Sequence, residues 1–252
     1  MKVDYHIHAE YSYDSKLKVE DLINKAISLK YESIAITEHL DLLPNELTRF
    51  GVPPFCKYIA QMRSLQAIHA SSPLGIICGV EVGDYQRVLP FASEFLAQLD
   101  FDLILGAVHF LSDHTNVAVP LRNPLTPAQI LDYYRHNLAL VSNCDIQVLA
   151  HLGVYKRYYA QTPDESHCEG IFADIFQTMI ERGIALEINF SGLRKPYGKM
   201  LPEPDQIDLY RSLGGTLFSL GSDAHQMQDF DALYPELPDW LVSGLIRLPR
   251  TT

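Results

Sequence analysis

Two histidines, His6 and His8, stand one residue apart in the first apolar run of the sequence, MKVDYHIH. Alternate residues of a β-strand point to the same face, so a strand here would aim both imidazoles at one place. Imidazole, together with carboxylate, suits zinc, manganese or iron. A single His-x-His pair is more often two half-buried histidines than a metal site, so the rest of the sequence decides between these interpretations.

Histidines elsewhere in the chain follow the same placement. The sequence contains seven short apolar or β-branched runs, and six of its ten histidines stand within about the last three residues of such a run. A random distribution would place about one histidine there. The shared position indicates a shared role, and carboxylates occupy two of the same windows. These residues are His6, His8, His39, His109, His151 and His225, together with Glu81 and Asp223.

The apolar runs alternate with amphipathic segments of helical period. Thr126, Pro127 and Gln129 form a capping-box sequence at the start of one such segment. Near-continuous apolar strands that alternate with helices are typical of a parallel sheet covered on both faces. The expected strands are residues 3–8, 33–38, 74–82, 102–109, 146–151, 184–190 and 216–223; the expected helices lie around 22–29, 58–70, 91–99, 126–141, 168–181 and 204–213, with a short one after 225.

Seven strand–helix units predict an α/β fold, and the commonest closed form of such repeats is the eight-stranded barrel. We therefore expect a distorted, TIM-like (β/α)7 barrel formed by a single domain over residues 1–252, with an open doubly wound sheet as the alternative. A parallel barrel gathers the carboxyl ends of its strands at one rim. The long connections 40–54, 111–125 and 152–166 also follow strands, so they would border that rim.

Convergence at one rim would bring together more ligands than one tetrahedral ion can use. We therefore expect two or three divalent ions, namely zinc, manganese or iron, with Glu81 placed to bridge two of them. The formal net charge of −11 agrees with a protein that holds cations, because ligand carboxylates are counted in that sum without their metals.

The composition excludes several other classes of protein. A hydrophobic fraction of 47% supports a sizeable core, and an acidic chain without a basic run is unsuited to long nucleic acids. No stretch of 18 apolar residues and no signal-like amino terminus occurs, so we expect a cytoplasmic protein that does not cross a membrane. The four cysteines are far apart and no GxSxG motif occurs, which argues against a covalent intermediate. The oligomeric state is left open.

The short motifs at the ends of the expected strands form a series. In chain order they are DYHIH, ITEHLD, GVEV, GAVHF, AHLG, EINFSGLRK and GSDAH. This series resembles the metal-binding motifs of the PHP (polymerase and histidinol phosphatase) family, and it is most similar to that of the stand-alone histidinol-phosphate phosphatases. The resemblance spans nearly the whole chain. It implies a distorted seven-stranded barrel and a site of two or three metals that hydrolyses a phosphoester.

The resemblance also implies roles for individual residues. Arg194 matches a phosphate-contacting arginine of these phosphatases, Arg157 is a candidate for a second one, and Lys195 is a further candidate for the substrate site. Glu81 matches the bridging carboxylate. The implied metal ligands are His6, His8, Asp14, His39, Glu81, His109, His151, Asp223 and His225.

The expected reaction is hydrolysis of a phosphate monoester, with L-histidinol phosphate as the substrate that the resemblance implies and histidine biosynthesis as its setting. A hydroxide shared by two cations would attack phosphorus, and Arg194 would neutralise the phosphoryl oxygens. Asp223 or His225 would assist the leaving alkoxide.

Three other functions remain open from the sequence. The first is a phosphodiesterase or nuclease of the same family acting on nucleotides or short oligonucleotides. The second is a metal-dependent amidohydrolase, although such barrels usually have eight strands and a bridging lysine. The third is a metal-binding scaffold without catalytic activity.

Overall fold

The computed structural model describes residues 2–248, and its centre is a sheet of seven parallel strands in sequence order. The sheet curls so that its first and last strands approach one another, with a parallel bridge between Ile7 and Ala224 at their carboxyl ends. The consecutive strand order confirms the distorted seven-stranded barrel and rules out the open doubly wound sheet, whose strand order reverses. The strands are β1 (Val3–Ile7), β2 (Ser33–Asp41), β3 (Gly75–Gly83), β4 (Leu103–Ala107), β5 (Val148–Leu149), β6 (Ala185–Asn189) and β7 (Phe218–Gly221).

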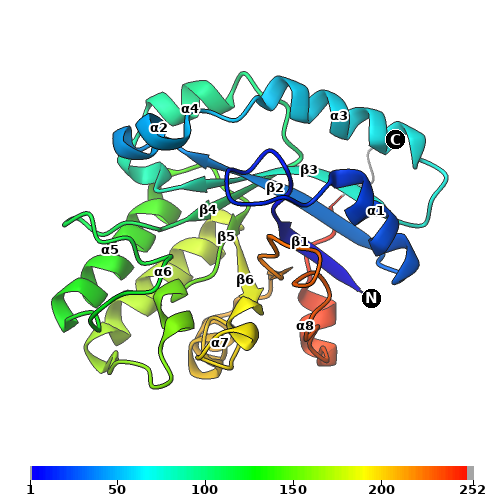
Figure 1. Ribbon diagram of the computed structural model, residues 1–252. Helices are drawn as coiled ribbons and strands as arrows, with labels where there is room; N and C mark the ends of the chain where they lie inside the picture. Colours follow the sequence, from blue (N-terminus) through cyan, green and yellow to red (C-terminus); the bar gives the residue numbers. More distant parts are fainter. Residues whose placement is uncertain (1, 249–252) are drawn as a thin grey trace.

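Helices cover the outside of the barrel (Figure 1). The strands are buried nearly throughout, which explains why their sequences read as continuous apolar runs. The expected capping box is present: the Thr126 hydroxyl accepts from the Gln129 backbone N–H. The helices are α1 (Val19–Ser28), α2 (Pro44–Phe50), α3 (Phe55–Ile68), α4 (Phe91–Leu96), α5 (Pro127–Asn143), α6 (Glu169–Arg182), α7 (Pro204–Ser212) and α8 (Asp239–Gly244); the 3-10 turns are η1 (Tyr85–Arg87), η2 (Val154–Tyr158), η3 (Ser166–Cys168) and η4 (Ser191–Arg194).

The barrel closes between β1 and β7 by a mixture of backbone and side-chain hydrogen bonds. At the carboxyl ends, the His8 N–H donates to the Ala224 carbonyl (2.9 Å) and the Asp223 N–H donates to the His6 carbonyl (2.8 Å). Farther down, the Tyr234 hydroxyl lies 3.1 Å from the Val3 nitrogen and 3.0 Å from its carbonyl oxygen. These side-chain bonds satisfy backbone groups that an eighth strand would otherwise pair.

Most of the expected elements occur close to their predicted positions. The strand expected over 146–151 is shorter than predicted, with β5 covering only Val148–Leu149, and the connection 152–166 contains the turn η2. Two further differences concern helices. Residues 40–54 are not a continuous loop, because β2 runs on to Asp41 and the short helix α2 (Pro44–Phe50) follows. The short helix expected after His225 is instead α8 (Asp239–Gly244), which lies farther along the chain. No helix within residues 2–248 is long and apolar enough to span a bilayer.

Candidate metal centre

The nine expected ligand residues gather at the carboxyl rim of the barrel, where most of them are buried, His225 is half-buried and Asp14 is exposed. Three groups of these residues have closely spaced ligand atoms. Within each group, one ligand atom from each residue lies within 4.8 Å of those from the other residues. Asp14 and Asp223 border the same cluster, at 3.3 Å from His225 Nε2 and 3.4 Å from His8 Nε2. The three groups are His8, His39 and His225; His6, His8 and Glu81; and Glu81, His109 and His151.

Glu81 lies at the centre of this cluster, and its two oxygens face different histidines. Oε1 lies 2.8 Å from His151 Nε2 and 3.4 Å from His6 Nε2. Oε2 lies 3.0 Å from His39 Nδ1 and 3.5 Å from His8 Nε2. A carboxylate with each oxygen directed at a separate set of imidazoles has the geometry of a bridging ligand.

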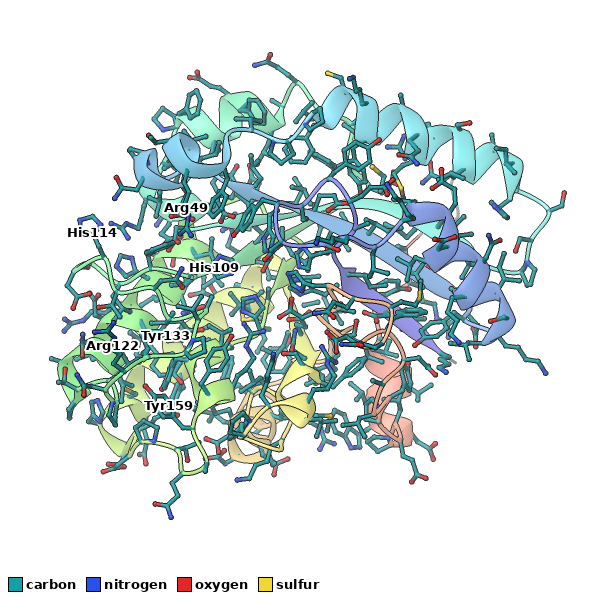
Figure 2. All side chains as sticks on the ribbon, viewed as in Figure 1. Arg49, His109, His114, Arg122, Tyr133 and Tyr159 are labelled. Atoms are coloured by element: carbon teal, nitrogen blue, oxygen red, sulfur yellow. The ribbon has the colours of Figure 1, made fainter. Side chains whose placement is uncertain are left out.

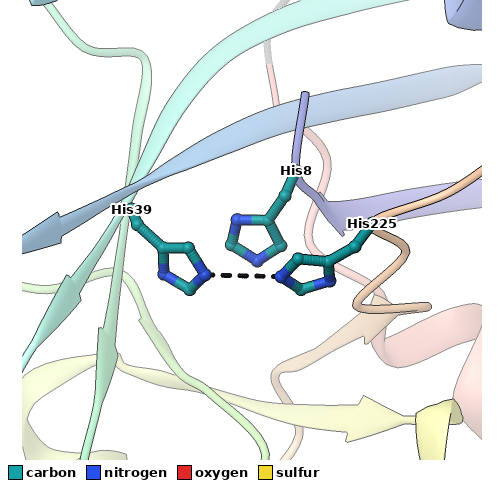
Figure 3. A group of neighbouring side chains, drawn as sticks. All are labelled: His8, His39 and His225. Atoms are coloured by element: carbon teal, nitrogen blue, oxygen red, sulfur yellow. Dashed lines mark hydrogen bonds between the residues drawn. The ribbon is translucent and has the colours of Figure 1, made fainter. Parts of the chain in front are cut away.

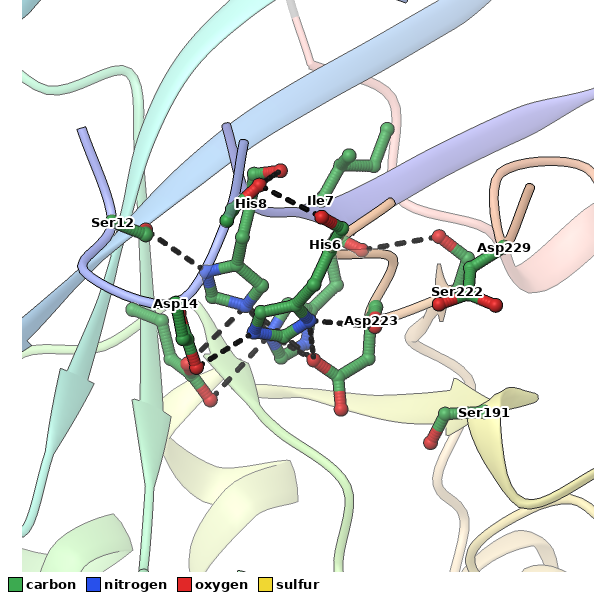
Figure 4. A network of polar contacts seen from close by, with 12 residues as sticks. His6, Ile7, His8, Ser12, Asp14, Ser191, Ser222, Asp223 and Asp229 are labelled. Carbon is green, nitrogen blue, oxygen red and sulfur yellow. Dashed lines mark hydrogen bonds and ion pairs between the residues drawn. The ribbon is translucent and has the colours of Figure 1, made fainter. Parts of the chain in front are cut away.

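A second part of the cluster is formed by His8, His39 and His225, which come from separate segments of the chain (Figure 3). The Nε2 atoms of His39 and His225 lie 3.4 Å apart. Asp14 contacts both, with its oxygens 3.6 Å from His39 Nε2 and 3.3 Å from His225 Nε2. Figure 4 shows Asp223 directed toward the imidazoles of His6 and His8.

The donor set fits divalent cations, and the fit can be seen in the outer nitrogens of the imidazoles. The Nε2 atoms of His6 and His8 face each other at a distance of 3.1 Å. As metal ligands, both nitrogens would be unprotonated and would each offer a lone pair to a cation. Their Nδ1 atoms are each held from outside, by Glu187 Oε1 (2.7 Å) and by Ser12 Oγ (3.4 Å). Metal-binding histidines are typically oriented in this way by a polar partner on the far nitrogen.

The electrostatics of the cluster favour ionised carboxylates. Burial raises the pKa of Glu81, but His6 and the other imidazoles outweigh it, so this pKa lies well below its ordinary value. Burial lowers the pKa of His109, yet Asp41 and Glu81 together raise it to about 10. A bound divalent ion would displace the proton that such an imidazole holds.

Two of the expected ligand residues adopt a backbone conformation that is uncommon outside glycine. His151 has φ 27° and Asp223 has φ 52°. The surrounding structure holds both in place: the His151 N–H donates to Glu187 Oε2 (2.5 Å), and the Asp223 N–H donates to the His6 carbonyl (2.8 Å). Such strain costs about 1–3 kcal/mol per residue and concentrates at functional sites, where it aims a side chain.

The cluster opens into a cavity of about 330 Å³ that also receives the expected cationic residues. The Arg157 guanidinium is buried; its Nη1 contacts Asp223 Oδ2 and lies 3.2 Å from Ser191 Oγ. Arg194 Nη2 donates to the Ser222 carbonyl (2.7 Å), and exposed Lys195 lies at the cavity wall. Figure 2 shows His114 at the outer edge of the molecule, apart from His109 in the cluster.

Several buried carboxylates that contact the cluster were not singled out from the sequence. Glu187 holds His6, and Asp41 lies beside His39 and His109. Burial raises the pKa of Asp4 to about 7; its Oδ1 accepts from the Ser222 N–H (3.0 Å) and so supports the seam beside His6. Only the position of Glu187 in the expected strand 184–190 could have drawn attention to it, because acidic residues are rare inside buried strands.

We expect the substitution Glu187→Gln to weaken metal binding without removing a ligand. The amide preserves the size of the side chain but loses the charge that accepts from His6 Nδ1. Loss of such a partner should lower metal affinity by about 10- to 100-fold. Competition titration with a metal indicator measures the effect. A variant that holds its metals as tightly as the wild-type protein would show that Glu187 does not orient His6.

A family model described as the PHP domain matches residues 4–191, which is well over half of the chain. The chain belongs to the PHP domain family. This membership agrees with the seven-stranded barrel and with the clustering of histidines and acids at its rim.

Relatives within the family point to one type of enzyme. A Thermotoga maritima protein named "Probable histidinol-phosphatase" is 28% identical over 90% of this chain and 85% of its own length. A Lactococcus lactis histidinol-phosphatase is 26% identical over 89% and 84%. The crystal structure of histidinol phosphate phosphatase from L. lactis, complexed with zinc, L-histidinol and phosphate, superposes with a TM-score of 0.76 at 25% identity and covers 89% of this chain and 86% of that one.

Proposed function

We propose that this protein is a metal-dependent phosphoric monoester hydrolase that converts L-histidinol phosphate to L-histidinol and phosphate. One observation carries the proposal: buried imidazoles and carboxylates surround Glu81 and open into the same cavity as Arg157 and Arg194. Metal ligands beside fixed guanidinium groups suit a phosphate ester. The relatives named above supply the identity of the substrate.

The cavity residues would hold two or three divalent ions, with zinc, manganese and iron as the candidates. Glu81 would bridge two of them, and the His8, His39 and His225 group with Asp14 would hold the third. When bound, the ions supply Lewis acidity that activates water and neutralises the phosphoryl oxygens. The chain supplies a rigid set of ligands, because the Nδ1 atoms of His6 and His8 each have a polar partner and the His151 backbone N–H is held by Glu187.

The arginines and Asp223 would then act on the phosphate and the leaving group. The planar guanidinium of Arg157 matches the geometry of two phosphoryl oxygens, and Arg194 stands near it at the Ser222 carbonyl. Burial raises the pKa of Asp223, but Arg157 and His8 outweigh it, so the carboxyl stays ionised. Asp223 is therefore better suited to hold a cation than to protonate the leaving oxygen, and His225 would supply that proton only where it does not hold the third ion.

The distribution of charge in the cavity suits a substrate with a cationic end. Asp41 and Glu46 lie on the His39 and His109 side, away from the Asp223 and Ser191 side where Arg157 is bound. Within the described residues, Asp41 Oδ2 has no hydrogen-bond partner. An aminoalkyl phosphate such as histidinol phosphate could place its phosphate at the arginines and its ammonium at these carboxylates.

Assays on four substrates test the proposal. We expect rapid turnover of histidinol phosphate, slower turnover of an aryl phosphate, and little or none of an aryl phosphodiester or a dipeptide amide. Preference for the diester would favour the nuclease alternative, and preference for the amide would favour an amidohydrolase. Absence of turnover on all four by protein with measured bound metals would favour the scaffold and refute the proposal.

We expect Asp41→Asn to reduce selectivity for the amino group of the substrate. Because the carboxylate would pair with the ammonium, its loss should raise KM for histidinol phosphate about tenfold. Aryl phosphate lacks an ammonium and serves as the internal control, since any disturbance of His39 or His109 affects both substrates. An equal change in kcat/KM for the two substrates would remove Asp41 from the specificity site.

A further inference from the structure

Lys156 is an ammonium group buried inside the protein, outside the metal cluster. Its side chain has 0% exposure, and Nζ lies 2.6 Å from Glu165 Oε2 and 2.7 Å from Glu203 Oε2. A buried lysine with two carboxylate partners is costly to assemble, because each charge loses its hydration. Replacing such a cluster by apolar residues is often neutral or stabilising, so stability alone is a weak explanation for it.

The two carboxylates are themselves held firmly. The hydroxyls of Tyr134 (2.7 Å) and Tyr155 contact Glu165 Oε1, and Gln206 Nε2 donates to Glu165 Oε2 (3.2 Å). Glu203 is the N-cap of α7 and forms a capping box with Gln206. The ammonium of Lys156 therefore joins η2 to the segment before η3 and to the start of α7. We call Lys156, Glu165 and Glu203 the lysine clamp.

The lysine clamp acts on the turn that carries Arg157. Lys156 and Arg157 are neighbours in η2, a 3-10 turn of five residues. So short a turn cannot hold its own conformation, because it forms too few internal hydrogen bonds. It depends on outside anchors: the hydroxyl of Tyr133 on α5, a side chain marked in Figure 2, accepts from the Gly153 N–H (2.9 Å), and the Tyr197 N–H donates to the Arg157 carbonyl (3.3 Å).

Arg157 leaves η2 on the cavity side. Its Nη1 contacts Asp223 and Ser191, and its Nη2 lies 3.3 Å from the Ala118 carbonyl. The cation at position 156 thus faces the protein interior while the cation at position 157 faces the cavity. A shift of η2 by about 1 Å would misplace the guanidinium, and errors of that size cost up to about 100-fold in enzymes.

We propose that Lys156 is a positioning residue that fixes Arg157 for the phosphate group of the substrate. It acts through η2 and touches neither the metals nor the substrate. This inference rests on the proposed function in one respect, namely that Arg157 binds the phosphate.

The variant Lys156→Met tests the proposal, with Arg63→Met as its control. Arg63 also pairs with carboxylates, at 2.8 Å from Asp102 and 3.1 Å from Asp100, but it lies on α3 and does not line the cavity. For K156M we expect KM and the inhibition constant of inorganic phosphate to rise together by about tenfold, with metal content unchanged and a smaller change in kcat. For R63M we expect a lower Tm with unchanged phosphate inhibition.

A double substitution shows whether the effect passes through Arg157. We expect phosphate to inhibit the double variant K156M/R157A as strongly as it inhibits R157A alone. The effects of residues that act through one another are not additive. If K156M does not fold, Glu203→Gln replaces it: this partner is 18% exposed, and the change leaves the Lys156–Glu165 pair in place. E203Q should weaken phosphate inhibition in the same direction.

The possible failures can be told apart. A folded K156M or E203Q protein with wild-type phosphate inhibition would overturn the lysine clamp, whatever the true substrate is. A wild-type protein that binds phosphate but does not hydrolyse histidinol phosphate would overturn the proposed function and leave the clamp intact. Equal losses of phosphate binding in K156M and R63M would reduce the clamp to a contribution to stability.

Discussion

Replacing Glu81 by glutamine should remove metal from the centre and lower kcat/KM by at least about 1000-fold. The reason is geometric: Oε1 faces His151 and His6, while Oε2 faces His39 and His8. The amide has one oxygen in place of two, and its NH2 group cannot bind a cation. The variant keeps the size of the side chain, so the barrel should remain folded. Metal analysis of the purified protein and steady-state kinetics measure the two losses.

Asp102→Asn is the matched control for this prediction. Asp102 is also a largely buried carboxylate with several partners, 2.8 Å from Arg63 Nη1 and 2.8 Å from the Cys78 nitrogen, but it lies away from the cavity. We expect D102N to lower stability and to retain metal and turnover. An E81Q protein with a full metal complement and normal kcat/KM would show that Glu81 does not bridge cations in this enzyme.

Apart from Asp14, which the family resemblance alone supplied, the positions of the expected ligands could be predicted because they follow from strand periodicity. Each buried parallel strand reads as an apolar run, and the residues that end it must reach the carboxyl rim. His109 and His151 were placed correctly by this rule although they are 42 positions apart in the sequence. The rule needs no knowledge of the helices, so its success does not depend on helix boundaries.

Residues that support the ligands could not be predicted in the same way. Glu187 contacts His6 across 181 positions, and Lys156 contacts Glu203 across 47. Such contacts depend on the packing of whole elements, and no spacing of residues in the sequence predicts them. Helix α2 did leave a signal, because Pro44 suits the first position of a helix, but its seven residues carry no buried stripe to complete the pattern.

The structure also explains why two cationic residues expected at the substrate site differ in their fit to it. Arg157 is buried and bound by Asp223 and Ser191, whereas Lys195 is exposed and lies only at the cavity wall. A fixed guanidinium loses little entropy when phosphate binds, whereas a mobile ammonium must be ordered. We therefore propose Arg157 and Arg194 as the principal phosphate contacts, with a lesser part for Lys195.

Removal of bound metal with a chelator should abolish turnover and lower Tm by about 10 °C. The cluster holds Glu81 and Asp223 with five buried imidazoles and half-buried His225, and a cation that binds only the folded state stabilises it by mass action. We expect zinc, manganese or iron, added back separately, to restore both Tm and turnover, and the most active of them identifies the preferred ion. Recovery of Tm without turnover by any ion would favour the scaffold alternative. The sequence contains no serine or cysteine nucleophile motif that would offer a route without metal. Full turnover in protein that holds less than one ion per molecule would nevertheless contradict a metal-dependent reaction.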